Sequence, residues 1–173
     1  MDTGVRMDIA TMVDIFKKGL EGLKADPASR QSERLYYELV IRYYERILQA
    51  KSQGNPQAMV GVFVPSELFY AMDIVPMHLE CTASIMTILL NKYEEFLVAA
   101  RSYGLAPETC SGHRILAAGF IQKEIPSPDF IVWSNQVCDN TAKSGDALME
   151  LYHIPGFYLD RPYRYTEREV AYL

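Results

Sequence analysis

Two cysteines, Cys110 and Cys138, are the residues whose type and position point most directly to chemistry. Cys110 lies in the run PETCSGHR and Cys138 in the run DFIVWSNQVCDNTAKSG, and each directly precedes a segment with helical patterning. The free backbone N–H groups and the positive end of the dipole at a helix start favour the thiolate form of a cysteine. Because the thiolate is the form that binds iron, the two positions predict a metal centre beside a substrate cleft.

The spacing of these cysteines leaves a second interpretation open. They are too far apart in the sequence to form a compact CxxC metal motif, and free cysteine is among the most buried residue types, which favours two inert core thiols. Iron–sulfur clusters, however, take thiolates from segments that are distant in sequence. The third cysteine, Cys81 in HLECTAS, is interpreted as structural.

A carboxylate and a hydroxyl follow the first predicted strand and form a second candidate site. Glu67 and Ser66 lie in the turn of VPSELFYAMD, where Pro65 starts a helix. A Glu two residues into a helix complements the helix dipole by default. If it faces a cleft instead, burial can tune it for general-base work, with Ser66 as a weaker candidate.

The elements that position these residues alternate between helices and strands. Helical spacing of apolar residues predicts helices over 7–23 and 32–48, and the breaks DPAS and SQGNPQ follow them. Short apolar runs predict strands at 58–65, 74–80, 129–135 and 156–162, with helices from 65, over 82–103, from 111 and over 139–152.

This alternation predicts an α/β fold with a doubly wound, Rossmann-like, mostly parallel four-stranded sheet. The helical arm is expected over 1–55 and the Rossmann-like lobe over 56–173. Ligands of such folds gather at the carboxyl ends of the strands. The turn from Pro65 to Glu67 and the segment from Asn135 to Cys138 should therefore open onto one crevice.

Composition excludes several classes of partner. The net charge is −5 and no run of Lys and Arg occurs, which argues against nucleic acid and anionic membranes. No apolar stretch is long enough to span a bilayer and the N-terminal segment lacks a signal-peptide pattern, so a cytoplasmic location is expected. An odd number of cysteines fits a reducing compartment. Neither GxGxxG after the first strand nor GxxxxGK[ST] is present, so the sequence does not support a nucleotide site of those kinds.

Several runs in order resemble one protein family. VFVPSELFYAMDIVP, CSGHR, PDFIVWSNQVCDNTAKSG and HIPGFYLDRPY are similar to the amino-terminal domain of the 2-hydroxyacyl-CoA dehydratase and benzoyl-CoA reductase family, from about Gly61 to Pro162. The resemblance implies that Cys110 and Cys138 are the first two of three cysteines that ligate an oxygen-sensitive cluster, usually [4Fe–4S].

The resemblance also implies partners and a reaction. A related second subunit forms a heterodimer with the cluster-bearing chain, and an ATP-hydrolysing activator protein injects a low-potential electron. The electron reaches an acyl-CoA substrate as a ketyl radical anion and allows water to leave. An alternative is ATP-dependent reduction of an aromatic or unsaturated acyl-CoA by the same cysteines, and a third is a non-catalytic lobe that binds CoA or a second subunit.

Two departures from the family pattern accompany this resemblance. The third cluster cysteine of the family lies in a later lobe and has no counterpart before Leu173, so a fragment of a longer, multi-lobe subunit is expected. Asp73 stands where the family usually has Gly. Near the cluster, the resemblance makes His113 and Arg114 candidate cations and Asn135 a candidate hydrogen-bond donor to cluster sulfur.

Overall fold

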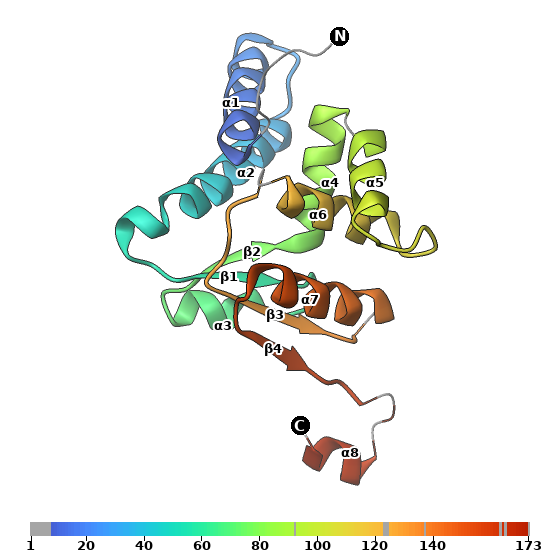
Figure 1. The fold of residues 1–173 in the computed structure, drawn as a ribbon. Helices are drawn as coiled ribbons and strands as arrows, with labels where there is room; N and C mark the ends of the chain where they lie inside the picture. Colours follow the sequence, from blue (N-terminus) through green and yellow to red (C-terminus); the bar gives the residue numbers. More distant parts are fainter. Residues whose placement is uncertain are drawn as a thin grey trace.

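The computed structural model describes residues 8–91, 93–122, 125–136, 138–162, 164 and 166–172. Its centre is a four-stranded sheet in the order β2-β1-β3-β4 (Figure 1), formed by β1 (Gln57–Val60), β2 (Val75–His78), β3 (Phe130–Ser134) and β4 (Gly156–Leu159). All three strand pairs are parallel. The predicted α/β, doubly wound architecture is therefore confirmed.

The first strand is shorter than its apolar run predicts. β1 is buried at every position but ends at Val60 rather than continuing to Pro65. Beyond it the chain makes a tight turn, because Val64 N–H donates to the Gly61 carbonyl at 3.0 Å. The apolar residues after Val60 thus form a loop at the end of the strand, not more strand.

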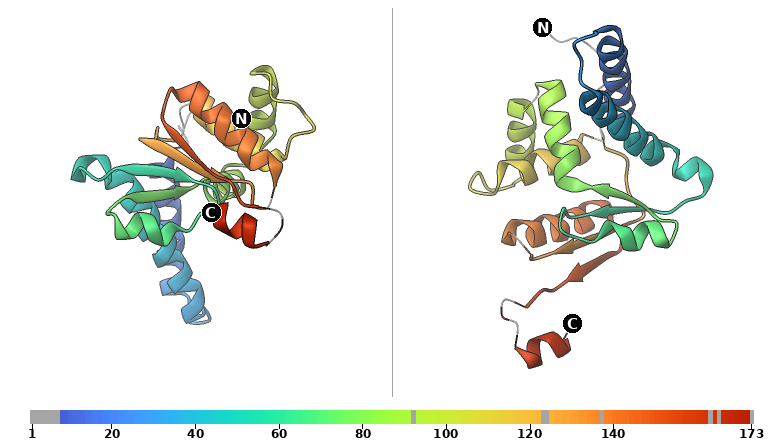
Figure 2. Two further views of the ribbon diagram at one scale, coloured as in Figure 1. Left: turned by 90° about the horizontal axis from the view of Figure 1, so that it is seen from below. Right: turned by 180° about the vertical axis from the view of Figure 1, so that it is seen from behind.

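Helices cover the two faces of the sheet unequally (Figures 1 and 2). One face packs on α4 (Leu79–Leu90), α6 (Ser111–Ile121) and α7 (Asp139–Tyr152), and α5 (Tyr93–Ser102) lies outside them against α6. On the other face Ala58, Val60 and Val132 pack with Phe69 of α3 (Ser66–Ala71). The main core therefore lies between the sheet and the α4, α6 and α7 layer.

The single long helix predicted over 82–103 is wrong. The structure has two helices, α4 and α5, and Asn91 at the end of α4 adopts a left-handed conformation with φ 48°. Its N–H donates to the Thr87 carbonyl, as in other helix C-caps. Asn tolerates this conformation better than most residues, so a continuous apolar pattern does not exclude the break.

The backbone conformation of Asp73 shows why the related proteins usually have Gly at this position. Its φ is 56°, in the left-handed region that glycine adopts without strain. The strand that follows is nevertheless paired in register with β1, with Val75 opposite Gln57. An aspartate is therefore tolerated at this turn, and the geometry of β2 is preserved.

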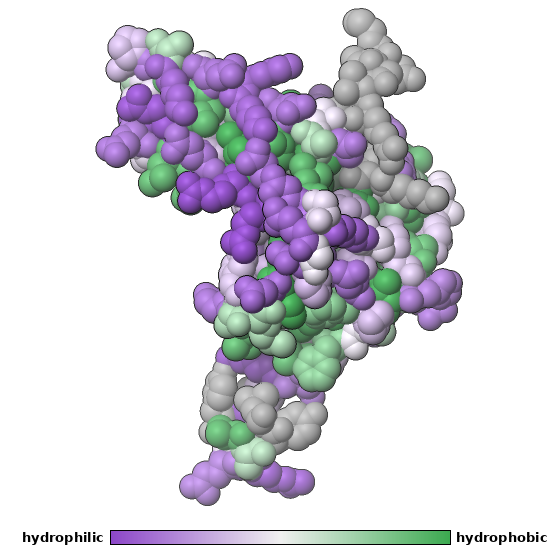
Figure 3. Space-filling view, turned by 90° about the vertical axis from the view of Figure 1, so that its left-hand side faces the viewer, coloured by the Kyte–Doolittle hydropathy of each residue, from purple (hydrophilic) through white to green (hydrophobic). Residues whose placement is uncertain are grey.

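The two predicted N-terminal helices form a hairpin, α1 (Ile9–Ala25) and α2 (Gln31–Gln49), which a short 3-10 turn, η1 (Lys51–Gln53), follows. The predicted start at Met7 lies outside the described residues. Figure 3 shows the hairpin projecting from the rest of the molecule with a mostly hydrophilic surface.

The second half of α2 docks on the lobe. Tyr43 Oη accepts a hydrogen bond from His78 N–H at 2.7 Å, and Tyr44 is buried with its hydroxyl 3.4 Å from Thr82 Oγ1. The Arg46 guanidinium lies over the Tyr70 ring, 4.9 Å from its centre. The tyrosines at 43 and 44 therefore pack α2 against the lobe.

A last short helix, α8 (Glu167–Tyr172), follows β4 and was not predicted. Within the described residues, no helix is both long enough and apolar enough to cross a membrane.

Candidate functional site

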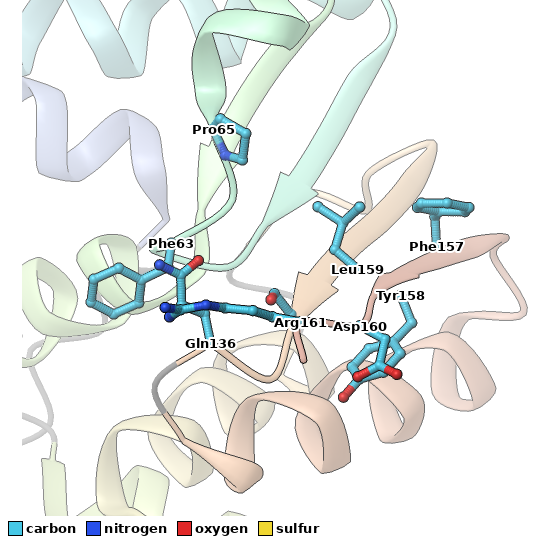
Figure 4. Close-up of a pocket in the computed structure, with 9 residues that line it drawn as sticks. Phe63, Pro65, Gln136, Phe157, Tyr158, Leu159, Asp160 and Arg161 are labelled. Atoms are coloured by element: carbon cyan, nitrogen blue, oxygen red, sulfur yellow. The ribbon is translucent and has the colours of Figure 1, made fainter. Parts of the chain in front are cut away.

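The loops at the carboxyl ends of the strands enclose an open cavity, here called the crevice (Figure 4). The chain passes from β1 to β2 on one side and then to β3 on the other, so a switch of strand order lies beside β1, where such folds bind ligands. The crevice measures about 500 Å³. Its apolar lining comprises Phe63, Pro65, Phe157, Tyr158 and Leu159, and its polar lining comprises Ser134, Gln136, Asp160 and Arg161.

One buried amide holds the β4 side of the crevice in place. Asn135 Nδ2 donates to Asp160 Oδ1 at 2.9 Å and to the Arg161 carbonyl at 3.1 Å, and Arg161 N–H donates to Asn135 Oδ1 at 2.7 Å. Both N–H bonds of the Asn135 amide are used in these contacts. The hypothesis that Asn135 donates to cluster sulfur is therefore wrong, because its role is to join the loops after β3 and β4.

A smaller cavity adjoins the crevice and contains a carboxylate that the sequence interpretation missed. This Glu80 cavity, of about 10 Å³, is lined by Gly61, Val62, Phe63, Val64, Glu80, Ser134 and Thr141. Its volume is close to that of a single water position. Because Phe63 and Ser134 line both cavities, the Glu80 cavity lies directly beside the crevice.

Glu80 has the environment of a proton-transfer group. It lies in the first turn of α4, just after β2, and its Oε2 accepts a hydrogen bond from Val62 N–H at 2.9 Å. Burial raises the pKa of this carboxyl, and the hydrogen bonds from backbone N–H groups oppose the shift only in part. The sequence signal was a Glu directly after a buried strand, the same signal that singled out Glu67.

Ser66 and Glu67 lie in the first turn of α3, as predicted, but neither lines the crevice or the Glu80 cavity. The prediction that these two segments open onto one crevice is confirmed by other residues, because Pro65 of the first segment and Gln136 of the second both line it. Glu67 lies close enough to His78 for its negative charge to raise the pKa of that imidazole, against a larger lowering by burial. A catalytic role for Ser66 and Glu67 stays a prediction.

Both candidate cysteines occupy the predicted helix starts. Cys110 is the N-cap residue of α6 and Cys138 that of α7, and neither side chain makes a capping hydrogen bond. The two helices pack together, and both begin at the end of the sheet where the strands finish (Figure 1). Cys110 is exposed and Cys138 half-buried, so the interpretation of both as buried core thiols is wrong.

The thiols of the described residues do not by themselves form a metal site. All three cysteines are free thiols, and Cys81 is exposed on α4 rather than packed in the core. A Cβ built at Gly112 would lie 3.8 Å from the Cys110 Sγ, which is an ordinary van der Waals contact, so this glycine does not constrain the thiol. Among the described residues, no group of three or more His, Cys, Asp and Glu side chains could hold a metal. These residues therefore offer two thiols at one end of the sheet and not a complete ligand set.

His113, three residues after Cys110, does not supply the cation that was considered for this site. Its side chain is buried, and burial lowers the pKa of the imidazole, so it is neutral at pH 7. Its Nδ1 is buried without a hydrogen-bond partner among the described residues. Arg114 is tied to the preceding loop, because its Nε donates to the Thr109 carbonyl at 3.0 Å.

Comparison with known proteins gives one finding. A family model described as 2-hydroxyglutaryl-CoA dehydratase, D-component, matches residues 61–173, which is more than half of the chain. The matched segment contains the strands β2 to β4, the helices α3 to α8, both cavities and all three cysteines, and begins directly after β1. No curated protein matches the chain. The family match confirms the resemblance that the sequence motifs indicate.

Proposed function

Because the chain belongs to the 2-hydroxyglutaryl-CoA dehydratase D-component family, we propose that it forms part of an iron–sulfur enzyme that removes water from a 2-hydroxyacyl-CoA. The thioester substrate is proposed to bind at the carboxyl ends of the strands, where the crevice and the Glu80 cavity adjoin. The observation that carries the proposal is the placement of Cys110 and Cys138 as N-cap residues of two neighbouring helices at this same end.

In this proposal Cys110 and Cys138 ligate a [4Fe–4S] cluster, and the remaining ligands come from outside the described residues. The cluster, when bound, would supply a single electron to the thioester carbonyl. Each thiol lies at the positive end of a helix dipole, beside the free N–H groups of the first turn of its helix.

Glu80 is proposed to handle the protons of the reaction. Loss of water needs an acid that protonates the departing hydroxyl group and a base that takes a proton from the neighbouring carbon. A carboxyl whose pKa is raised by burial can serve both steps in turn, because it holds its proton more tightly than an ordinary Glu, gives that proton to the departing hydroxyl group and can then accept the proton from the neighbouring carbon. The hydrogen bond from Val62 N–H fixes one oxygen of this carboxylate in place.

Two protein partners complete the proposed enzyme. The word component in the family description supports a second dehydratase component as partner. An ATP-hydrolysing activator protein is proposed to deliver the electron, since the chain contains neither of the common nucleotide motifs. The enzyme is proposed to work in the cytoplasm, where free thiols persist.

The test is an anaerobic assay of the chain with its second component, the activator protein, ATP and a reductant. We expect conversion of a 2-hydroxyacyl-CoA to the enoyl-CoA, and we expect Glu80→Gln to lower kcat by about 10² or more, as loss of a general acid–base group does. The matched control Cys81→Ser should retain activity.

Two results of this assay would contradict the proposed dehydration and favour another function. Formation of a ring-reduced or saturated acyl-CoA instead of the enoyl-CoA would assign the chain to acyl-CoA reduction. Full activity of a complex in which Cys110 and Cys138 are both serine would leave only the role of a lobe that binds CoA or the second component.

A further inference from the structure

The proposed proton-transfer group does not line the crevice. Glu80 belongs to the lining of the Glu80 cavity, whereas the lining of the crevice, drawn in Figure 4, does not include it. Of the described residues, Phe63 and Ser134 line both spaces. The side chain of Phe63 has no group that can carry a proton, whereas Ser134 has a hydroxyl group. Ser134 is therefore the lining residue that can connect Glu80 chemically to a ligand in the crevice.

The Ser134 hydroxyl is suited to pass a proton on. Ser134 is the last residue of β3, at the carboxyl end of the sheet, and its exposed fraction is 6%. A hydroxyl group both donates and accepts hydrogen bonds, so it can take up one proton as it gives away another. Among the described residues, the Ser134 hydroxyl has no hydrogen-bond partner. Buried hydroxyl groups of this kind are normally satisfied by ordered water.

The Glu80 cavity has the size and the lining of a site for one water. Its volume of about 10 Å³ matches the least space that a water molecule needs. A buried water usually makes about three hydrogen bonds. The carboxyl of Glu80 and the hydroxyl groups of Ser134 and Thr141 are three polar groups in this lining, and the other lining residues have apolar side chains or none. A general acid or base can act on a substrate through one such water.

From these observations we propose that Ser134, through one water bound in the Glu80 cavity, relays protons between Glu80 and the substrate in the crevice. This inference rests on the proposed function and deepens it. The Glu80 carboxyl gives its proton to the water, the water gives one to the Ser134 oxygen, and Ser134 gives its own hydroxyl proton to the departing hydroxyl group. Glu80 is then a carboxylate, and both the water and Ser134 are neutral again. The proton from the neighbouring carbon returns to Glu80 along the same path.

The anaerobic assay of the chain with its second component, the activator protein, ATP and a reductant tests the relay. Ser134→Ala should lower kcat by about 10² with little change in KM, because the proton path is lost and the binding surface stays. The solvent deuterium isotope effect on kcat should rise in this variant, because proton transfer then limits the rate. Ser134→Thr keeps a hydroxyl group and should retain most of the rate. The matched control is Ser102→Ala, which removes an exposed hydroxyl on α5 that lines neither cavity.

A crystal structure of the full chain tests the water without any need for activity. We expect one water in the Glu80 cavity, within hydrogen-bond distance of both Glu80 and the Ser134 hydroxyl. A cavity filled by side chains would contradict the relay.

The outcomes separate the relay from the proposed function. Full activity of Ser134→Ala would overturn the relay and leave the proposed function in place. An unchanged isotope effect, or an equal loss of rate in Ser134→Thr, would also overturn it, because packing and not the hydroxyl would then be responsible. An inactive wild-type complex would count against the proposed function as well. Thr141→Val is the second variant if Ser134→Ala does not fold: it removes one partner of the water, and an unchanged rate and isotope effect would overturn the relay.

Discussion

Glu80 shows how folding changes the pKa of a side chain that the sequence alone does not mark as unusual. Its carboxyl lies in a small cavity with the hydroxyl groups of Ser134 and Thr141 among the lining residues, and burial raises its pKa. The shift favours the protonated form in the folded state. Folding stability should therefore depend on pH through this residue.

The sign of this dependence gives a residue-scale prediction. Because the folded pKa is raised, the contribution of Glu80 to stability is present below its unfolded pKa, ordinarily 4.5, and is lost as the pH rises through the folded value. Gln cannot lose a proton and keeps an oxygen for Val62 N–H. Urea unfolding over a range of pH from 4.5 upward should show that Glu80→Gln gains stability relative to the wild type as the pH rises. A constant difference across that range would contradict the assignment of a raised pKa.

The sequence predicts where a residue lies when that position depends only on the neighbouring residues in the chain. Cys110 and Cys138 were expected at helix starts because a helical pattern begins directly after each, and both are N-cap residues. Glu80 could not be distinguished from Glu67 in this way, because both follow a buried strand. The difference is that Val62 N–H and the Glu80 cavity come from a loop that only the folded sheet brings to Glu80.

At the scale of elements, Trp133 joins the sheet to α7. The indole of this single tryptophan is buried between the backbone of Gly145 on α7 and that of Gly156 at the start of β4. A Cβ built at either glycine would overlap the ring. The two glycines therefore allow α7 to lie close to β3 and hold Cys138, at the start of α7, at the carboxyl end of the sheet.

Gly145→Ala tests this contact. The added methyl group must displace a buried indole, so we expect a loss of about 1–3 kcal/mol in the free energy of unfolding. Gly22→Ala on α1 is the matched control, because nothing lies within 4 Å of its added Cβ and Ala is the better helix former. It should gain about 0.5–1 kcal/mol. Denaturant unfolding of both variants measures the difference, and equal effects would show that α7 does not need to lie so close to Trp133.

The elements themselves were mostly predictable, and the misses share a cause. The bounds of α7 match the prediction over 139–152, because turn residues mark both ends. The break between α4 and α5 was missed since Asn91 ends a helix through its backbone conformation and not through a change in the apolar pattern. The loop after β1 was predicted as strand because its residues are apolar; in the structure Val62 and Phe63 line the cavities, and Val64 packs in the smaller core cluster.

At the scale of the molecule, one hydrophobic core includes both the N-terminal hairpin and the lobe. Phe16 of α1 and Tyr44 of α2 belong to the same buried cluster as Met77 of β2 and Trp133 of β3. Gln57, the first residue of β1, reinforces the junction because its Nε2 donates to the Ile47 carbonyl at 3.3 Å. The hairpin and the lobe should consequently unfold together.

Coincident unfolding curves would confirm this. Trp133 fluorescence reports unfolding of the lobe and far-UV circular dichroism reports unfolding of all helices, so the two transition midpoints should agree. In Tyr44→Ala both midpoints should fall together, and the free energy of unfolding should decrease by about 3–5 kcal/mol. Tyr36→Ala, on the exposed side of the same helix, should change stability by less than about 0.5 kcal/mol. An earlier transition in circular dichroism alone would mean that the hairpin melts independently.

Iron binding by the two helix-start cysteines is the most direct test of the account. The full chain is reconstituted anaerobically with iron and sulfide, and 2-mercaptoethanol supplies the ligands that the described residues lack. The account predicts that the wild type and Cys81→Ser retain iron and sulfide after desalting, whereas Cys110→Ser and Cys138→Ser each lose most of both. Equal losses in all three variants, or no iron in the wild type, would contradict a cluster shared by Cys110 and Cys138.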